Sequence, residues 1–291
     1  MAFYSFEEIE KLCKKQEKSL WQAVLEQDAC EQDISTEESL AAMKKVWDAM
    51  KESIESYDPD MISKSGLVGG EGGRMAEYVK KGNTFCGPFV SGVISRALMM
   101  GCSNACMRRI VAAPTAGACE VLPAVLYGCM ESGTEEEEII HALYVAAGVG
   151  QVIAQRAYIS GAAGGCQAEI GSASGMAAAA LTALRGGTPA QMGDACAMAL
   201  KNLMGLVCDP VGGLVEVPCV KRNVIGAVNA LSAADMALAG IKSTIPVDQV
   251  IDAMREVGDA MDNSLKETAR GGLAVTPKAA ALVESIQNVI R

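Results

Sequence analysis

The sequence has few aromatic residues and almost no histidine. Phe, Trp and Tyr together make up 4% of the 291 residues, and His141 is the single histidine. A β-sandwich is built mainly from Val, Ile, Thr and Tyr, whereas Ala, Gly, Met and Leu, which dominate here, suit closely packed helices. We therefore expect an all-α, multi-helix fold. A single histidine, expected near a helix start, also argues against a closed zinc site.

The chain also lacks an excess of positive charge, a secretion signal and an uninterrupted apolar run. Its net charge is −10 and its pI is near 4.8, which argues against binding to nucleic acid or to an anionic membrane. The opening residues, MAFYSFEEIEKLCKKQEKS, are too polar for a signal peptide, and we expect a cytoplasmic protein. The apolar stretch 143–165 is interrupted by Gln151, Gln155 and Arg156, which favours a buried helix over a membrane span.

Helix start signals recur along the chain. Ser5 and Ser35 each begin an S-x-x-E capping box that is followed by an apolar-periodic run. Thr188 and Thr276 each precede a proline, which places the proline just inside an expected helix with the threonine as its cap. These residues are therefore expected to have structural roles.

Glycine-rich loops separate the expected helices. They lie at 65–78, 113–123, 161–175, 208–219 and 269–274. Glycine lets backbone amides approach a ligand closely, so several such loops indicate one shared pocket. The GLVGGEGG stretch lacks the Lys-Ser/Thr pair of a phosphate-binding loop, which argues against a nucleotide.

Eleven cysteines in a chain without a secretion signal are not expected to form a disulfide framework. Those expected inside helices are interpreted as packing residues: Cys13, Cys30, Cys129 and Cys196. Cys102 and Cys106 have a spacing that could bind a metal, but no third ligand is nearby and packing is favoured. His141 is interpreted as a partly buried helix residue rather than a ligand.

Cys166, Cys208 and Cys219 differ because each lies in a glycine-rich loop beside turn residues. Their spacing is a poor fit to a structural zinc site, which needs four ligands. Three thiolates on such loops suit an iron–sulfur cube in which the protein binds three irons and the fourth is open. An open iron is a Lewis acid that can hold a substrate oxygen. From spacing alone, metal binding, thiol reactivity and simple burial all stay open.

Five stretches resemble the alpha chain of the bacterial iron–sulfur-dependent L-serine dehydratases. In chain order they are SGLVGGEGGRM, APTAGACEVLPAVL, GCQAEIGSASGMAAA, GLVCDPVGGLVEVPCVKRN and KETARGGLA. The resemblance implies a helical domain whose loops converge on a 4Fe-4S cluster, and deamination of L-serine to pyruvate and ammonia without pyridoxal phosphate. It also implies that the cluster ligands are Cys166, Cys208 and Cys219. We expect residues 1–64 to form a charged N-terminal helical segment packed on the core, and residues 65–291 to form the iron–sulfur catalytic domain.

The resemblance implies roles for the residues beside the ligands. Gln167 and Glu169 are expected to form hydrogen bonds around the cluster cysteines, although Glu169 equally suits a helix cap. Asp209 is expected to fix the turn after Cys208. These three residues would then orient the ligands.

Other residues are expected to contact the substrate. The P-T-x-G-A loop, with Thr115 and Gly117, belongs to the substrate pocket by resemblance, although Thr115 equally suits a helix cap. Ser65 and Ser172 are, like Thr115, possible polar contacts. Lys266 and Arg270 are candidates to neutralise the substrate carboxylate, and an ordinary helix-end charge is the alternative for both. The sequence does not identify the base that removes the α-proton.

The charged first sixty residues stand where some single-chain relatives carry an extra domain. The chain therefore resembles one half of the two-chain form and is expected to need a separate beta chain. Its ending, SIQNVIR, has no cysteine, so the tail is not expected to supply a fourth thiolate. Two alternatives stay open: a cysteine desulfidase with the same cluster chemistry, and a non-enzymatic iron–sulfur sensor or scaffold subunit.

Overall fold

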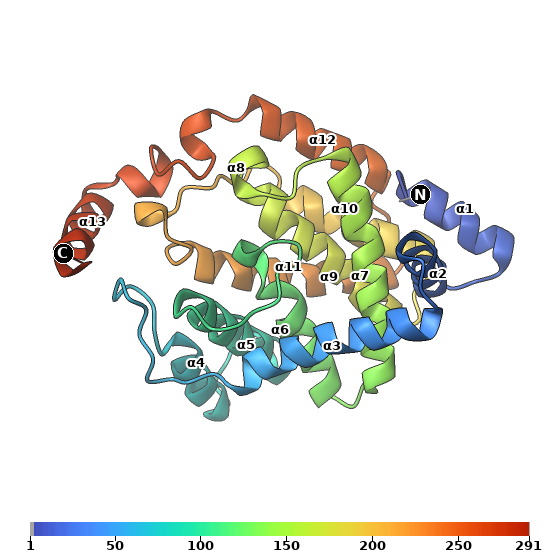
Figure 1. The fold of residues 1–291 in the computed structure, drawn as a ribbon, viewed down its shortest axis with the longest axis horizontal. Coiled ribbons are helices and arrows are strands. Elements are labelled where there is room, and N and C mark those ends of the chain that lie inside the picture. Colours follow the sequence, from blue (N-terminus) through green and yellow to red (C-terminus); the bar gives the residue numbers. More distant parts are fainter. Residues whose placement is uncertain (1–2, 291) are drawn as a thin grey trace.

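The computed structural model describes residues 3–290, which fold into α-helices joined by turns (Figure 1). These residues form thirteen α-helices and only isolated β-bridges, which confirms the expected all-α fold. The helices are α1 Phe6–Gln16, α2 Leu20–Gln32, α3 Thr36–Glu55, α4 Glu71–Lys80, α5 Gly87–Ala105, α6 Val121–Glu131, α7 Glu136–Arg156, α8 Gly161–Gly164, α9 Ser172–Leu184, α10 Pro189–Leu203, α11 Cys219–Leu238, α12 Val247–Ala260 and α13 Pro277–Ile290. Shorter turns are η1 Ala116–Ala118, η2 Gln167–Gly171, η3 Val211–Gly213, η4 Asn263–Leu265 and η5 Gly272–Val275, of which η2 is π-helical.

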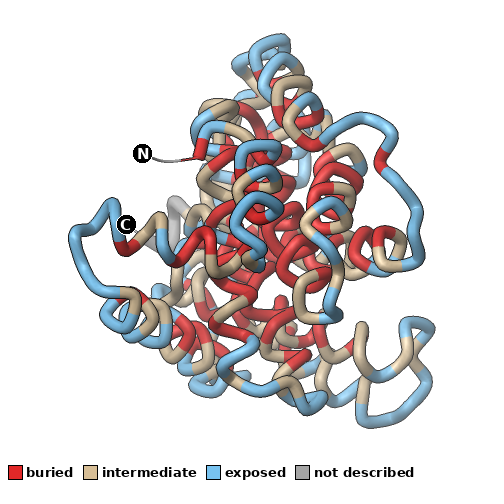
Figure 2. Tube along the Cα trace, turned by 90° about the vertical axis from the view of Figure 1, so that its right-hand side faces the viewer, coloured by how far each residue is buried: buried red, intermediate tan, exposed pale blue. Residues whose placement is uncertain are grey.

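The helix α9 lies at the centre of the fold. It packs against α6, α7, α10 and α11, and its residues 172–182 are all buried. Its sequence, SASGMAAAALTAL, consists mostly of small residues, which let neighbouring helices approach closely. Figure 2 shows the buried interior surrounded by exposed turns. Because α9 directly follows η2, the packing around α9 also holds the segment that contains Cys166.

The helices α1, α2 and α3 add to this core. Ser5 and Ser35 form the predicted capping boxes, in which each hydroxyl accepts a hydrogen bond from the backbone amide of Glu8 or Glu38. Trp47 of α3 is completely buried in the main hydrophobic core. In Figure 1, α1 and α13 lie at opposite ends of the molecule. The domain boundary expected at residue 64 stays a prediction.

Two of the predicted glycine loops are partly wrong. The 65–78 stretch contains the start of α4 at Glu71, and the 161–175 stretch is mostly helical, running through α8, η2 and the start of α9. The prediction of loops was partly wrong because many of these glycines allow helices to pack closely against each other. A Cβ on Gly72, for example, would lie 2.7 Å from the backbone nitrogen of Met99 on α5. Glycine here marks a close helix contact rather than a turn.

Most predictions for the helix residues are confirmed. Three cysteines are buried inside helices as expected: Cys13, Cys129 and Cys196. Cys30 on α2 is exposed, so the prediction that it packs in the core is wrong. His141 is partly buried on α7, where its ring stacks on Trp21 with the ring centres 3.6 Å apart. Among residues 3–290, no helix has both the length and the apolar character needed to cross a membrane.

Candidate functional site

Cys166, Cys208 and Cys219 lie together in the interior. Their exposed fractions are 2%, 4% and 9%. The pKa of the Cys166 thiol is raised well above its usual value by hydrogen bonding to Cys208, by burial, and by the charges of Cys208 and Cys219. Burial and the neighbouring Cys208 likewise raise the pKa of Cys219 to about 12. Three thiols from distant parts of the sequence are therefore close enough to affect one another, and we call this group the thiol site.

The turn that carries Cys166 is held by its neighbours. Gly165 has a φ of 78°, a left-handed conformation that favours glycine, and a Cβ there would lie 3.0 Å from the Leu206 carbonyl oxygen. The Gln167 side chain donates to the carbonyls of Gly164 and Met254 and accepts from the amide of Gly205. Gln167 thus ties the Cys166 turn to α12 and to the segment before Cys208.

The backbone of Cys208 pairs with the segment after η4. The Cys208 amide donates to the Leu265 carbonyl at 2.8 Å, and the Glu267 amide donates to the Cys208 carbonyl at 2.7 Å. These bonds place the Lys266 backbone directly beside Cys208. Arg270, four residues later, is exposed and forms no ion pair with residues 3–290. The structure therefore brings the Lys266 backbone next to a thiol-bearing residue, whereas Arg270 is on the surface.

Asp209 fixes the turn after Cys208. Its Oδ2 accepts the Leu273 amide at 2.7 Å, and Arg222 Nη1 lies 2.7 Å from its Oδ1. The same Arg222 donates to the Val207 carbonyl. Because Arg222 is on α11, which begins at Cys219, these contacts join the segments of two of the thiols.

Glu169 links the thiol site to the loop before α6. Thr115 Oγ1 donates to Glu169 Oε1 at 2.7 Å, so the Thr115 hydroxyl binds Glu169 and does not cap η1. A Cβ on Gly117 would lie 2.7 Å from Oε1, and a Cβ on Gly161 would lie 2.8 Å from Oε2 and 2.7 Å from Cys208 Sγ. The two glycines leave room for the carboxylate beside the thiol. Burial raises the pKa of Glu169, although the bond from Thr115 opposes this.

Ser65 lies in a different environment. Its hydroxyl donates to Glu216 and contacts Ser63 at 3.0 Å, and it lines a mainly apolar groove with Met107 and Leu214. No hydrogen bond joins Ser65 to a thiol-site residue within the described chain. The polar partners of Ser65 thus come from its own loop and the η3 region.

Two buried residues near the thiols, Glu120 and Asn223, were missed by the sequence interpretation, and a third buried residue, Ser172, was expected only as a polar contact. Within the described chain, a side-chain oxygen of each has no hydrogen-bond partner: Glu120 Oε2, Ser172 Oγ and Asn223 Oδ1. Ser172 directly follows η2, and the pKa of Glu120 is raised well above its usual value by burial. Asn223 lies one helical turn after Cys219, a spacing that could have revealed it. Unpaired buried polar atoms are rare in folded proteins. In the described chain they also occur away from the thiols, at Trp47 Nε1, Ser91 Oγ and Arg96 Nη1.

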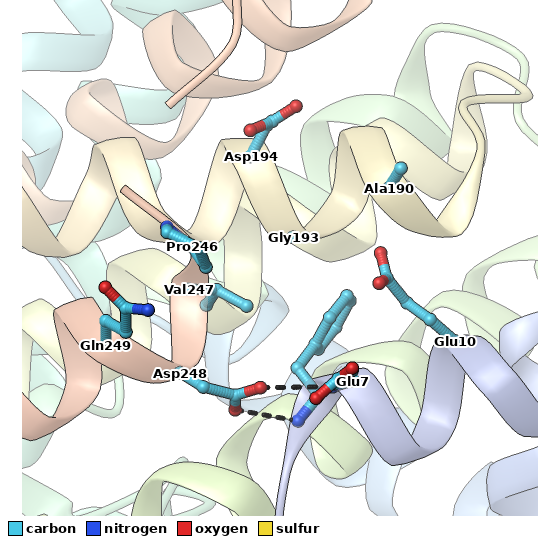
Figure 3. Close-up of a pocket in the computed structure, with 10 residues that line it drawn as sticks. Glu7, Glu10, Ala190, Gly193, Asp194, Pro246, Val247, Asp248 and Gln249 are labelled. Carbon is cyan, nitrogen blue, oxygen red and sulfur yellow. Dashed lines mark hydrogen bonds between the residues drawn. The ribbon is translucent and has the colours of Figure 1, made fainter. Parts of the chain in front are cut away.

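A wide cavity of about 520 Å³ lies elsewhere, between α1, α10 and α12 (Figure 3). It is lined by Phe6, Glu7, Glu10, Ala190, Gly193, Asp194, Pro246, Val247, Asp248 and Gln249, and we call it the acidic cavity. Both oxygens of Asp248 accept backbone amides at the start of α1, and Asp194 accepts the amide of Ser243. Over residues 3–290, no three His, Cys, Asp or Glu side chains have the spacing to hold one metal ion, at this cavity or at Cys102 and Cys106.

The fold and the site define a class of protein: a helical chain in which three buried thiols from distant segments meet beside a carboxylate. The profile of a protein family described as serine dehydratase alpha chain matches residues 15–274. The chain belongs to the serine dehydratase alpha chain family.

Individual relatives agree with this assignment. The chain is 49% identical over 238 residues to a probable L-serine dehydratase alpha chain of Bacillus subtilis (strain 168), covering 81% of this chain and 79% of the relative. It is 39% identical over 269 residues to an L-serine dehydratase alpha chain of Peptoniphilus asaccharolyticus, covering 92% of each. An L-serine dehydratase of Helicobacter pylori is 35% identical over 283 residues, which are 95% of this chain but 62% of that relative.

Proposed function

We propose that this chain is the alpha subunit of an L-serine dehydratase, an ammonia-lyase that converts L-serine to pyruvate and ammonia, and that it uses a 4Fe-4S cluster bound by Cys166, Cys208 and Cys219. The observation that carries the proposal is the meeting of these three thiols beside the Glu169 carboxylate. The membership of the chain in the serine dehydratase alpha chain family supports the substrate and the reaction.

Three thiols are a donor set that suits a cluster with one open iron, whereas a structural zinc ion usually has four ligands. Ligands of one zinc ion lie about 2.0–2.3 Å from a common point, and the described residues contain no such group. Buried thiols with raised pKa values are neutral when free, and binding to iron stabilises their thiolate form. When bound, a cluster with three protein ligands supplies a Lewis acid for a substrate oxygen.

The residues of this chain then have distinct roles. Gln167 and Asp209 hold the turns that carry Cys166 and Cys208, through the bonds described above. Thr115 orients the Glu169 carboxylate, and Gly117 lets that carboxylate approach its loop closely. We assign the surroundings of this carboxylate to the substrate, because they are next to a thiol and bounded by polar groups. Burial of the site keeps bulk water away from the reacting α-carbon.

The substrate carboxylate needs a positive partner. Lys266 is the stronger of the two candidates, since its backbone pairs with Cys208, whereas Arg270 is exposed. Ser65 contacts Glu216 instead, so a substrate role for Ser65 is not favoured by its surroundings.

We also propose a separate beta chain as partner. The matched relatives from Bacillus subtilis and Peptoniphilus asaccharolyticus are named alpha chains. The longer Helicobacter pylori relative has additional sequence beyond the part that this chain matches. A second polypeptide would supply that part here.

The proposal is tested by anaerobic reconstitution with iron and sulfide, followed by a pyruvate assay with and without a beta chain. The wild-type chain should develop the brown absorbance of a cluster and form pyruvate from L-serine. Cys208→Ser should lose both, because one iron loses its ligand. Cys196→Ala is the matched control: Cys196 is a buried thiol on α10, and its loss should leave both signals. Wild-type cluster absorbance in Cys208→Ser would overturn the ligand assignment.

A further inference from the structure

Asn223 has an unusual set of contacts. It is 1% exposed, and its Nδ2 donates to the carbonyl of Gly117 at 2.7 Å and to the carbonyl of Cys219 at 3.2 Å. Carbonyl oxygens only accept hydrogen bonds, so the atom facing them must be the amide nitrogen. The orientation of the Asn223 amide is therefore fixed by its partners.

The other atom of this amide, Oδ1, is buried and has no donor among the described residues. A buried amide oxygen without a donor is unfavourable, because it has lost its hydrogen bonds to water. If Asn223 served only to join Gly117 to α11, the amide nitrogen would be sufficient and the oxygen would have no role. The free oxygen indicates that Asn223 has a second partner.

The surroundings of Asn223 show where this partner would bind. Cys219 and Asn223 lie one turn apart on α11, so their side chains share a face of the helix. Gly117, which Asn223 contacts, also borders the Glu169 carboxylate, and Glu169 in turn borders Cys208 across Gly161. Contacts therefore connect Asn223, through Gly117 and Glu169, with Cys208 of the thiol site. Glu169 offers carboxylate oxygens on the same side.

We propose that Asn223 Oδ1 accepts a hydrogen bond from the α-ammonium group of the substrate. This inference rests on the proposed function, under which the substrate is L-serine. An ammonium group only donates hydrogen bonds, so it matches a site whose nearest free groups are an amide oxygen and a carboxylate. Asn223 is then a substrate-binding residue that selects an amino acid over a hydroxy acid of the same length.

The test compares two compounds that differ in this one group. L-Serine and 3-hydroxypropionate share the carboxylate and the β-hydroxyl, and only L-serine has the ammonium. With the reconstituted enzyme and its beta chain, kcat and KM are measured for L-serine, and the inhibition constant Ki is measured for 3-hydroxypropionate. Cluster absorbance and thermal unfolding are recorded for every variant.

Asn223→Leu keeps the side-chain size but removes the whole amide, that is, Oδ1 together with the Nδ2 that bonds Gly117 and Cys219. The KM for L-serine should rise by about 10–100-fold, the size of a lost hydrogen bond to a charged group, while the Ki of 3-hydroxypropionate changes by less than about threefold. Asn104→Leu is the control, because Asn104 is only half-buried and donates to Ala116 in the same loop, and its loss should alter neither constant. Equal changes in both constants for Asn223→Leu, or no change, would overturn the proposal, since the oxygen would then serve packing or solvent.

Asn223→Asp keeps an acceptor in place, so its ratio of Ki to KM should stay at or above the wild-type ratio. A ratio that falls toward one would contradict the proposal. If neither variant keeps its cluster, the wild type still provides a test, because it should bind L-serine at least about tenfold more tightly than 3-hydroxypropionate. A wild-type enzyme that forms no pyruvate would refute the proposed function, whereas an active enzyme without this selectivity would refute only the role of Asn223.

Discussion

The thiol site and the acidic cavity differ in whether their polar groups have hydrogen-bond partners within the chain. The acidic cavity is wide and highly charged, but Asp248 and Asp194 are both engaged by backbone amides. The thiol site is tightly packed, yet it is surrounded by buried oxygens that have no partner in the described chain, including those of Glu120 and Asn223. Open space alone does not indicate function. Buried groups with unused bonding capacity indicate function only where they lie beside reactive side chains, as Glu120 and Asn223 do at the thiol site.

In each region a glycine allows close packing. Adding one methyl group to each glycine therefore gives a matched comparison of the two regions. A Cβ on Gly161 would lie 2.7 Å from Cys208 Sγ and 2.8 Å from Glu169 Oε2, whereas a Cβ on Gly193 would lie 2.8 Å from Phe6 Cε1. Gly161→Ala should displace a cluster ligand and lower the pyruvate-forming rate by at least about 100-fold, with loss of cluster absorbance. This is the largest effect that we predict.

Gly193→Ala should instead cost about 1–3 kcal/mol in the free energy of unfolding, because Phe6 must move, and leave the rate unchanged. Urea unfolding, cluster absorbance and the pyruvate assay on both variants separate these outcomes. If the two variants lost activity equally, the distinction between the regions would fail.

The acidic cavity should respond to loss of its helix cap. Asp248 accepts the amides of Phe6 and Glu7 at 2.8 and 3.1 Å. Dashed lines in Figure 3 mark the hydrogen bonds of Asp248. Asp248→Ala should lower the free energy of unfolding by about 1 kcal/mol, since the first amides of α1 lose their acceptor. Cluster absorbance should not change. Asp235→Ala, which removes an exposed carboxylate from α11, is the control and should alter stability much less.

The smallest predicted effect is an increase in the free energy of unfolding, and it depends on pH. The pKa of Glu10 is raised by burial and by the charges of Asp248, Asp194 and Glu7. The protonated form therefore favours the folded state, and its contribution is present below the unfolded value of 4.5 and lost as the pH rises through the higher folded pKa. At pH 7 the charged Glu10 is unfavourable.

Glu10→Gln removes that charge. It should increase the free energy of unfolding by roughly 0.5 kcal/mol near pH 7, with no gain at about pH 3.5. Urea unfolding at the two pH values measures the difference. Glu7→Gln, which breaks an exposed pair with Lys11, should show no such gain. A destabilised Glu10→Gln at pH 7 would mean that Glu10 has a favourable partner in the folded state.

Local sequence signals predicted local structure well. The capping boxes at Ser5 and Ser35 and the threonine cap at Thr188 are all present, because each depends on residues within one helical turn. Glycine was the least reliable signal. In the 161–175 stretch it was interpreted as a loop, but close packing of α9 and its neighbours requires small residues inside helices.

The site was predicted only in part. Resemblance indicated the three cysteines, and the structure places them together, but their role as ligands stays a proposal. The bond between Thr115 and Glu169 joins residues 54 positions apart, and the backbone pairing of Cys208 with the segment around Lys266 also depends on distant chain. No local pattern contains such contacts. Asn223 was missed for the same reason, since its importance comes from Gly117 as much as from Cys219.

The sequence by itself determined the helical class, the helix starts and the residue types available for chemistry, because these follow from local propensity, capping and composition. Only the tertiary structure decided which thiols meet, which carboxylate stands beside them and which buried oxygens are left without a donor. Those properties arise when helices distant in sequence pack around α9, and packing removes water from some polar groups while giving partners to others.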